Sequence, residues 1–293
     1  MDISEAGTSE TFDGMVAELA KYDLFKHAVE LQIYGLTVVP PEKMNHSPGF
    51  VDRLRNAILS VCESRHGVTI GDYRTDSLPP GAGGNNFKLM IENDVFAEAA
   101  TNPVQLALVR WLCGQSVVLA GNNYIIKGPG ADQHRLHSDA HGIPPGGGLI
   151  AHMCNASLPT TDYDTLEDGP TAFVPGSYVY GRATLPHESD VFNPWFKTHP
   201  VFAKAGSLIL WHGGTWHGAF PRSTPGLRVT LVQSFMRRHM RPLNLWEGTI
   251  PERMLEKYPE LDRVIGHSVY PFHDRPDGSL VPQFIRTGTH PSL

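Results

Sequence analysis

The order of helical and extended segments is the feature that most restricts the fold of this chain. From about residue 116, short runs of β-forming residues alternate with turns rich in glycine and proline. These runs span 116–127, 148–158, 171–177, 206–213 and 226–237. Short strands separated by loops predict an antiparallel sandwich or barrel, and a βαβ repeat is disfavoured because the helical segments come first.

The first third of the chain is expected to be mostly helical, because its apolar residues recur at helical spacing. The predicted helices of the whole chain cover 10–32, about 48–65, 94–113 and 249–266. The third of these is expected to kink or restart at Pro103, since proline cannot donate a hydrogen bond inside a helix. A short strand over 36–40 is predicted between the first two helices.

We expect a single domain over residues 1–293. It divides into a mostly helical part, a β-sandwich core, and a C-terminal helix and tail, which cover 1–115, 116–237 and 238–293. The segment 71–86 is too rich in glycine and proline for a core element and long for a plain connector. Loops of this length often bind or cover a ligand, so we predict a lid.

Composition excludes several classes of protein. The net charge of −6 argues against nucleic acid as a partner. No apolar run reaches the roughly 20 residues that span a bilayer, and the acidic N-terminal segment does not resemble a secretory signal. The three cysteines are widely spaced and form neither a CxxC pair nor a disulfide framework. We therefore expect a cytoplasmic monomer or homodimer that binds a small molecule, with no membrane association.

Residues 133–141, QHRLHSDAH, raise the question of a metal site. In an extended segment, residues two apart point to the same side, so His137 and Asp139 could contact one ion. A third ligand could come from WHGGTWHG (211–218), which offers His212 and His217. Two histidines and one carboxylate on one face form the ligand set of non-haem Fe(II) oxygenases. An H-x-D motif is common by chance, however, and hydrogen-bonded surface histidines are the alternative.

Arg228 lies on an otherwise apolar predicted strand, eleven residues after His217. A buried guanidinium needs an anion, and its planar fork matches a carboxylate in two parallel hydrogen bonds. A dicarboxylate such as 2-oxoglutarate could bind the metal at one end and Arg228 at the other. The alternative is a buried Arg–Asp pair within the sheet.

Four pieces of the chain together resemble the phytanoyl-CoA dioxygenase-like (PhyH) family of Fe(II)/2-oxoglutarate-dependent oxygenases. They are PGADQHRLHSD, DGPTAFVPGS, AGSLILWHGGTWHG and then Arg228, in this order. The resemblance covers about residues 116–237, with a weaker similarity near 30–45. It implies a mainly β fold with flanking helices: a double-stranded β-helix (jelly roll, cupin-like) core that carries the catalytic site and is buttressed by N-terminal helices.

The resemblance assigns roles to individual residues. His137, Asp139 and His217 match the iron ligands, and Arg228 matches the arginine that holds the distal carboxylate of 2-oxoglutarate. Thr171 lies where relatives often place a hydroxyl near the cosubstrate. The family pattern also selects His217 over His212 as the distal ligand, which leaves His212 packed near the site.

Further cosubstrate contacts are expected from Asn123 and Trp216. On the strand before the first ligand, the favoured alternation points Asn123, Ile125 and Lys127 inward, and a slip of one residue would substitute Asn122 and Tyr124. Core packing is the alternative role for Trp216. One departure from the family is visible, because many relatives have glutamine three residues before the first ligand, where this chain has His134.

The resemblance implies an enzyme that uses Fe(II), 2-oxoglutarate and O2 and releases succinate and CO2. We expect it to hydroxylate or otherwise oxidise an unactivated C–H of a small, largely apolar molecule, such as a specialised metabolite. Halogenating relatives replace the carboxylate ligand, so Asp139 favours hydroxylation. The alternatives are an acyl-CoA hydroxylase of the same family, a 2-oxoglutarate-independent cupin-type metal enzyme, and a non-catalytic jelly-roll binding module. Arg237, Arg238 and Arg241 could bind the phosphates of an acyl-CoA, but a solvated strand end is the favoured alternative.

Overall fold

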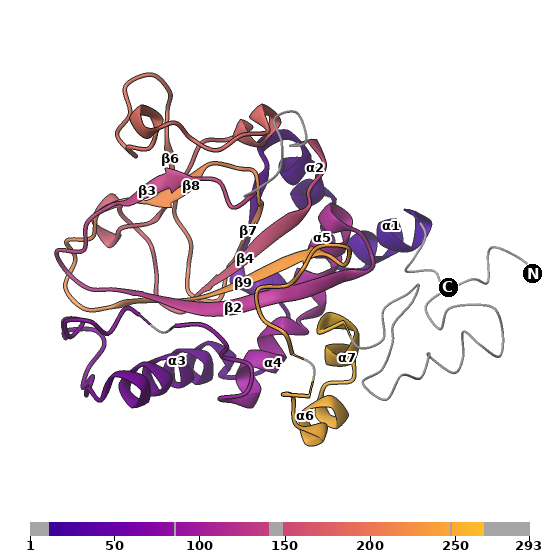
Figure 1. Cartoon of the computed structure of the whole chain (residues 1–293), viewed down its shortest axis with the longest axis horizontal. Helices are drawn as coiled ribbons and strands as arrows, with labels where there is room; N and C mark the ends of the chain where they lie inside the picture. Colours follow the sequence, from indigo (N-terminus) through magenta and orange to yellow (C-terminus); the bar gives the residue numbers. More distant parts are fainter. Residues whose placement is uncertain (1–11, 85, 141–148, 247, 267–293) are drawn as a thin grey trace, which may run out of the picture.

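A computed structural model describes residues 12–84, 86–140, 149–246 and 248–266 of the chain. These residues form two facing antiparallel sheets with helices packed against the larger one (Figure 1). The larger sheet consists, in spatial order, of β1 (Leu36–Val39), β7 (Leu208–His212), β4 (Met153–Pro159), β9 (Arg228–Arg237) and β2 (Val117–Lys127). The smaller sheet consists of β3 (His134–His137), β8 (His217–Ala219), β5 (Thr171–Phe173) and β6 (His199–Val201).

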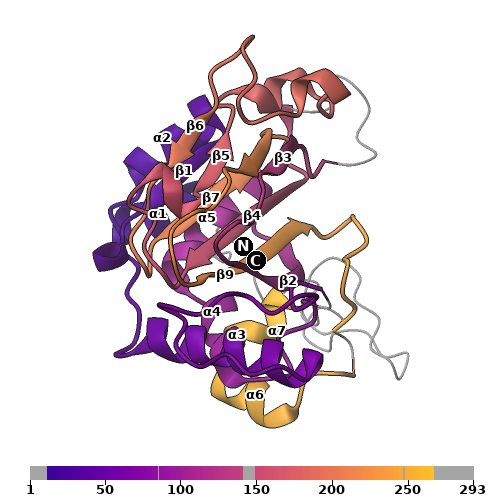
Figure 2. The ribbon, with the colours of Figure 1, turned by 90° about the vertical axis from the view of Figure 1, so that its left-hand side faces the viewer.

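The helices cover the outer face of the larger sheet, as Figures 1 and 2 show. They are α1 (Phe12–Lys21), α2 (Phe25–Tyr34), α3 (Phe50–His66), α4 (Asp94–Ala100), α5 (Pro103–Cys113), α6 (Glu252–Lys257) and α7 (Glu260–Val264). Short 3₁₀ turns occupy Pro41–Lys43, Leu166–Asp168, Ser177–Tyr180 and Pro186–Glu188. The main apolar core lies between the helices and the sheet, where Leu54 and Leu106 share a cluster with Leu231. The predicted mainly β fold with buttressing helices is confirmed.

Two predicted helices differ in detail from the observed ones, and the restart expected at Pro103 in a third is confirmed. The helix predicted over 10–32 is two helices, because the chain turns at Asp23 with a left-handed φ of 51°. The helix over 94–113 restarts at Pro103, where the side chain of Asn102 accepts hydrogen bonds from the first turn of α5. The C-terminal helix is likewise broken, into α6 and α7. None of the described helices is both long and apolar enough to cross a membrane.

Side-chain alternation in the larger sheet separates an inner face from a helix-facing one. On β9, Val232 faces inward and belongs to an apolar cluster that also includes Phe173 of the smaller sheet. The pairing register places Asn123 opposite Val232 and Lys127 opposite Arg228. The predicted inward alternation of β2 is therefore confirmed, and Tyr124 instead packs in the helix-side core.

The segment 71–86 runs beside one edge of the larger sheet. Near its start, the carbonyl of Tyr73 accepts a hydrogen bond from the backbone N–H of Leu227, at 2.6 Å. At its end, the side chain of Asn86 donates to the carbonyl of Tyr124, at 2.7 Å. One end is thus attached to β2 and the other to the residue just before β9, and the role of this segment as a lid stays a prediction.

Candidate metal centre

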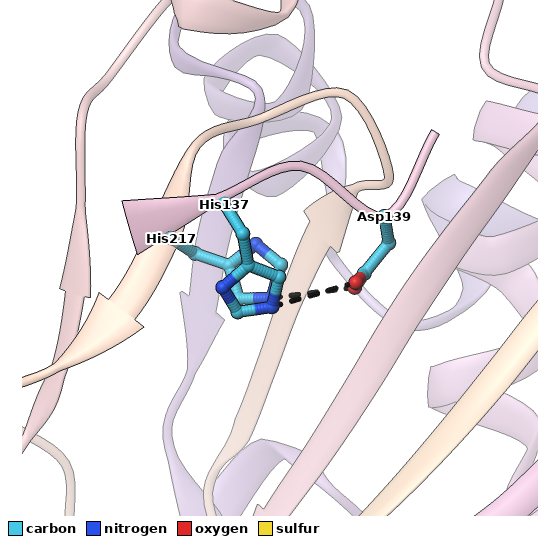
Figure 3. Close-up of side chains that lie close together, drawn as sticks. All are labelled: His137, Asp139 and His217. Carbon is cyan, nitrogen blue, oxygen red and sulfur yellow. Dashed lines mark ion pairs between the residues drawn. The ribbon is translucent and has the colours of Figure 1, made fainter. Parts of the chain in front are cut away.

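The pairing of β3 with β8 brings two histidines together from distant parts of the sequence. His137 lies directly opposite His217, and their ring centroids are 4.3 Å apart. After β3 the chain turns, and the backbone N–H of Asp139 donates to the carbonyl of Gly213 at 2.9 Å. This bond directs the Asp139 carboxylate toward both imidazoles (Figure 3).

The three side chains form a compact donor set. Nε2 of His137 lies 3.5 Å from one carboxylate oxygen of Asp139, and Nε2 of His217 lies 3.3 Å from the other. One ligand atom from each residue lies within 4.8 Å of the other two. Among the described residues, this is the one cluster of three or more histidine, cysteine or acidic residues with such spacing.

Hydrogen bonds fix which nitrogen of each histidine faces the centre. Nδ1 of His137 lies 2.9 Å from the carbonyl of Arg135, and Nδ1 of His217 lies 3.0 Å from that of Thr215. A carbonyl only accepts, so each Nδ1–H donates and each Nε2 keeps a free lone pair. The Asp139 carboxylate accepts a 2.6 Å bond from the side chain of Asn155. Such outer partners orient the ligands in metalloproteins.

Charges in the centre also suit a divalent cation. Burial, and then the neighbouring His217, lower the pKa of His137 to about 4, so its imidazole is neutral at pH 7. Burial raises the pKa of Asp139, but His217, His137 and the bond from Asn155 outweigh burial and bring it below its ordinary value. A neutral imidazole and an ionised carboxylate are the forms that bind a metal. The residues therefore fit an Fe(II) ion with open coordination positions.

Arg228, at the start of β9, is buried, and none of the described acidic residues forms an ion pair with it. Its side chain is 3% exposed, and its guanidinium lies 4.9 Å from the ring centre of Tyr163. One of its N–H groups donates to the carbonyl of Gly169, but its Nε has no hydrogen-bond partner. In the described part of the chain, no carboxylate lies within 4 Å of it, and the nearby Asp168 pairs with Arg222 instead, at 3.5 Å. The structure thus lacks the Arg–Asp pair that was the alternative.

The other predicted cosubstrate contacts divide between two faces. Thr171 lies two residues before Phe173, which is paired with His217, so alternation places Thr171 on the inner face with the ligands. Asn123 also lies on the inner face, through its pairing with Val232.

Trp216 lies on the outer face of the smaller sheet. It packs there with Leu136 and Phe220, and its indole N–H donates to the carbonyl of Arg182 at 2.9 Å. The structure therefore does not bring Trp216 together with the three candidate ligands, because adjacent residues of a strand point in opposite directions.

His212 is held away from the centre. It pairs with Cys154 on the helix-facing side of the larger sheet, and its Nδ1 accepts a 2.8 Å bond from the backbone of Gly214. His134 lies closer, with its ring centroid 4.8 Å from that of His137.

Sequence reasoning missed Asn155, which bridges the centre to the larger sheet. Its amide donates to Asp139, and its side-chain carbonyl accepts a 2.7 Å bond from the hydroxyl of Ser234 on β9. A polar residue within the apolar run 148–158 was the available signal. Only the strand register, which places Asn155 opposite both Ser234 and Trp211, shows where its side chain points.

Gly218 sets the separation between β8 and β3. A Cβ at this position would lie 2.3 Å from the carbonyl oxygen of His134, so Gly218→Ala must push the two strands apart. We expect a loss of about 1–3 kcal/mol in unfolding free energy, measured by thermal or urea unfolding. The control is Gly83→Ala, where the added Cβ meets nothing within 4 Å. Equal stability of the two variants would contradict this close approach.

Two facing antiparallel sheets with two histidines and a carboxylate on their inner surface define a jelly-roll protein with the donor set of a mononuclear non-haem metal site. The model of the phytanoyl-CoA dioxygenase (PhyH) family matches residues 36–230. The chain belongs to this family.

Curated relatives share part of the sequence. Dioxygenase af480 of Aspergillus fumigatus is 29% identical over 169 residues, which cover 57% of this chain and 53% of the relative. The multifunctional dioxygenase prhA of Penicillium brasilianum is 31% identical over 144 residues, covering 45% of this chain and 46% of the relative. The chain thus spans about half the length of the curated relatives it matches.

Solved structures share the fold. HygX from Streptomyces hygroscopicus, solved with nickel and 2-oxoglutarate, superposes with a TM-score of 0.59 at 19% identity, over 74% of this chain and 88% of that one. The epimerase SnoN, in complex with Fe3+, alpha ketoglutarate and nogalamycin RO, gives a TM-score of 0.56 at 21% identity, over 80% and 93% of the two chains.

Proposed function

We propose that this protein is an Fe(II)/2-oxoglutarate-dependent dioxygenase that oxidises an unactivated C–H of a small, largely apolar organic molecule, such as a specialised metabolite. One observation carries the proposal. The donor set of His137, Asp139 and His217 lies on the inner side of the two sheets together with Arg228, a buried guanidinium without a carboxylate partner among the described residues. A metal-chelating dicarboxylate satisfies both halves of this arrangement.

Each residue has a distinct role in the proposed site. Nε2 of His137, Nε2 of His217 and the Asp139 carboxylate hold the ion, and bound iron supplies the oxidation of the C–H group at the expense of O2 and 2-oxoglutarate, with succinate and CO2 as products. Asn155 holds the Asp139 carboxylate in place. Arg228 binds the distal carboxylate of 2-oxoglutarate through its unused N–H groups.

Apolar side chains pack around His217, the most buried of the three candidate ligands. The ring centroid of Trp211 lies 4.9 Å from that of His217, and the ring of Phe173 stacks on His217 at 6.0 Å. Both rings belong to the apolar cluster between the sheets. An apolar environment has a low dielectric constant, which strengthens the attraction between Arg228 and a carboxylate.

The relatives support an enzyme that acts on small molecules. The curated relatives are dioxygenases, and HygX has also been solved with hygromycin B, 2-oxoglutarate and nickel. SnoN was solved with nogalamycin RO. A 2-oxoglutarate-independent cupin-type enzyme is disfavoured, because it has no need of a buried arginine on the inner face of the sheet without a carboxylate partner among the described residues.

An anaerobic titration tests the proposal directly. Fe(II) and then 2-oxoglutarate are added to the metal-free protein, and the visible charge-transfer band of the complex is recorded. Addition of O2 should then release succinate. Iron binding without the band would favour the 2-oxoglutarate-independent alternative, and failure to bind iron would overturn the metal site itself.

Asn155→Ala should weaken iron binding by about 10- to 100-fold, because the Asp139 carboxylate loses the donor that orients it. The measurement is competition with a chelator of known affinity for Fe(II). Asn86→Ala serves as a control, since it removes an asparagine that donates to the backbone carbonyl of Tyr124, outside the centre. An Asn155→Ala protein with wild-type iron affinity would exclude a role for this bond in holding the ligand.

A further inference from the structure

A second cation lies beside Arg228 on the inner face of the larger sheet. Lys127 is the last residue of β2 and is the direct cross-strand neighbour of Arg228. Like charges in this position repel each other and destabilise a sheet. Burial, and then Arg228, lower the pKa of Lys127 to about 8, while Asp132 opposes them.

The surrounding carboxylates do not neutralise this pair of cations. Within the part of the chain that the structure describes, the Lys127 ammonium donates only to backbone carbonyls, those of Asp132 at 2.9 Å and Phe220 at 3.3 Å. Asp168 pairs with Arg222. Among the described residues, no carboxylate lies within 4 Å of the Lys127 ammonium.

Unused donors remain on both side chains. An ammonium has three N–H groups, and the two carbonyls take two of them. A guanidinium has five, of which one binds the carbonyl of Gly169, and the buried Nε binds nothing. The two side chains can therefore offer one donor from Lys127 and a fork from Arg228 to the same anion.

We infer that Lys127 and Arg228 form a two-cation anchor for one carboxylate, the distal carboxylate of the 2-oxo dicarboxylate cosubstrate. This inference rests on the proposed function and adds a second anchoring residue to it. The anion relieves the repulsion between the cations, so part of its binding free energy comes from a strain already present in the free protein.

The inference gives the affinity for 2-oxoglutarate a defined pH dependence. The charged groups that face Lys127 are Arg228 on β9, Asp132 in the loop after β2 and His134 on β3. Burial lowers the pKa of His134, so His134 is neutral between pH 7 and 9. Lys127, with its pKa lowered to about 8, changes charge within this range. Its protonated form binds the anion, so affinity is constant below pH 8 and falls as the pH rises above it.

Lys127→Met removes the charge and keeps most of the side-chain volume. The dissociation constant of 2-oxoglutarate for the anaerobic Fe(II) protein, read from the charge-transfer band, should rise about 10- to 100-fold. Binding of 2-oxovalerate, which lacks the distal carboxylate, should not change. Lys127→Arg should restore most of the affinity and abolish the loss of affinity above pH 8, because a guanidinium stays charged. Lys26→Met, at a lysine whose side chain is 81% exposed, is the control.

The outcomes separate this inference from the proposed function. Equal 2-oxoglutarate affinity in wild type and Lys127→Met would overturn the two-cation anchor and leave the proposed function intact. Equal weakening of 2-oxoglutarate and 2-oxovalerate would also overturn it, by showing a general structural effect. Absence of the band in the wild type would overturn the proposed function itself.

Discussion

His217→Ala is expected to abolish the anaerobic charge-transfer band with 2-oxoglutarate and to reduce succinate formation below detection. The substitution leaves one imidazole and one carboxylate for the ion. Loss of a residue that only orients a ligand costs about 10- to 100-fold in metal affinity, so loss of a ligand should cost more than about a hundredfold. Chelator competition measures the affinity, and succinate is quantified after addition of O2.

Two controls make the His217 result specific. His199→Ala removes an exposed histidine of β6 and should leave both readouts unchanged. His212→Ala tests the choice between the two histidines of WHGGTWHG, and the band should persist because His212 faces the helix side of its sheet. His217→Gln, which keeps the side chain polar and of similar size, separates ligand loss from unfolding. A band that survives in His217→Ala but not in His212→Ala would reverse the ligand assignment.

Arg228→Met is expected to raise the dissociation constant of 2-oxoglutarate by about a hundredfold or more, with iron affinity unchanged. Truncation of one partner in a buried, hydrogen-bonded charge pair costs about 2–5 kcal/mol. Most substitutions in a protein core lower the stability of the protein, but Arg228→Met should not. Replacing a buried, unpaired guanidinium with an apolar side chain leaves the melting temperature of the cosubstrate-free protein unchanged or higher.

Arg222→Met provides the contrast on a neighbouring buried arginine. Arg222 donates to the carbonyls of Asp168, Pro225 and Gly226, so its loss leaves several buried oxygens without partners. We expect this variant to melt at a lower temperature and, once folded, to bind 2-oxoglutarate more nearly as the wild type does. A lower melting temperature in Arg228→Met without loss of cosubstrate affinity would make Arg228 a structural residue.

The sequence pattern predicted the longer strands well and the shortest ones poorly. The ten- and eleven-residue strands β9 and β2 are long enough for their β-forming character to show. The strands β6 and β8 have three residues each, too few for a period of two to emerge. They are defined by their partners across the sheet, and sequence alone does not reveal these partners.

In the candidate site, too, features set by neighbouring residues could be predicted from the sequence, and features set by strand pairing could not. His137 and Asp139 were recognisable as a pair because their relation is local. The position of Asn155 depends on the register of three strands, which no local pattern gives. The outward direction of Trp216 could have been predicted, since the residue beside an inward-pointing ligand on a strand faces the other way.

The pairing of β3 with β8 has a consequence for the order of folding. His137 and His217 are eighty residues apart in sequence, and they meet only after the intervening chain has crossed between the sheets and returned. Loops of this length close slowly and lose much entropy, and the short strands offer few hydrogen bonds in return. An ion that binds only when β3 and β8 are paired stabilises the folded protein. It adds about 2.7 kcal/mol to the free energy of unfolding when present at a hundred times its dissociation constant. Release of the ion and fraying of the smaller sheet should therefore occur as one event.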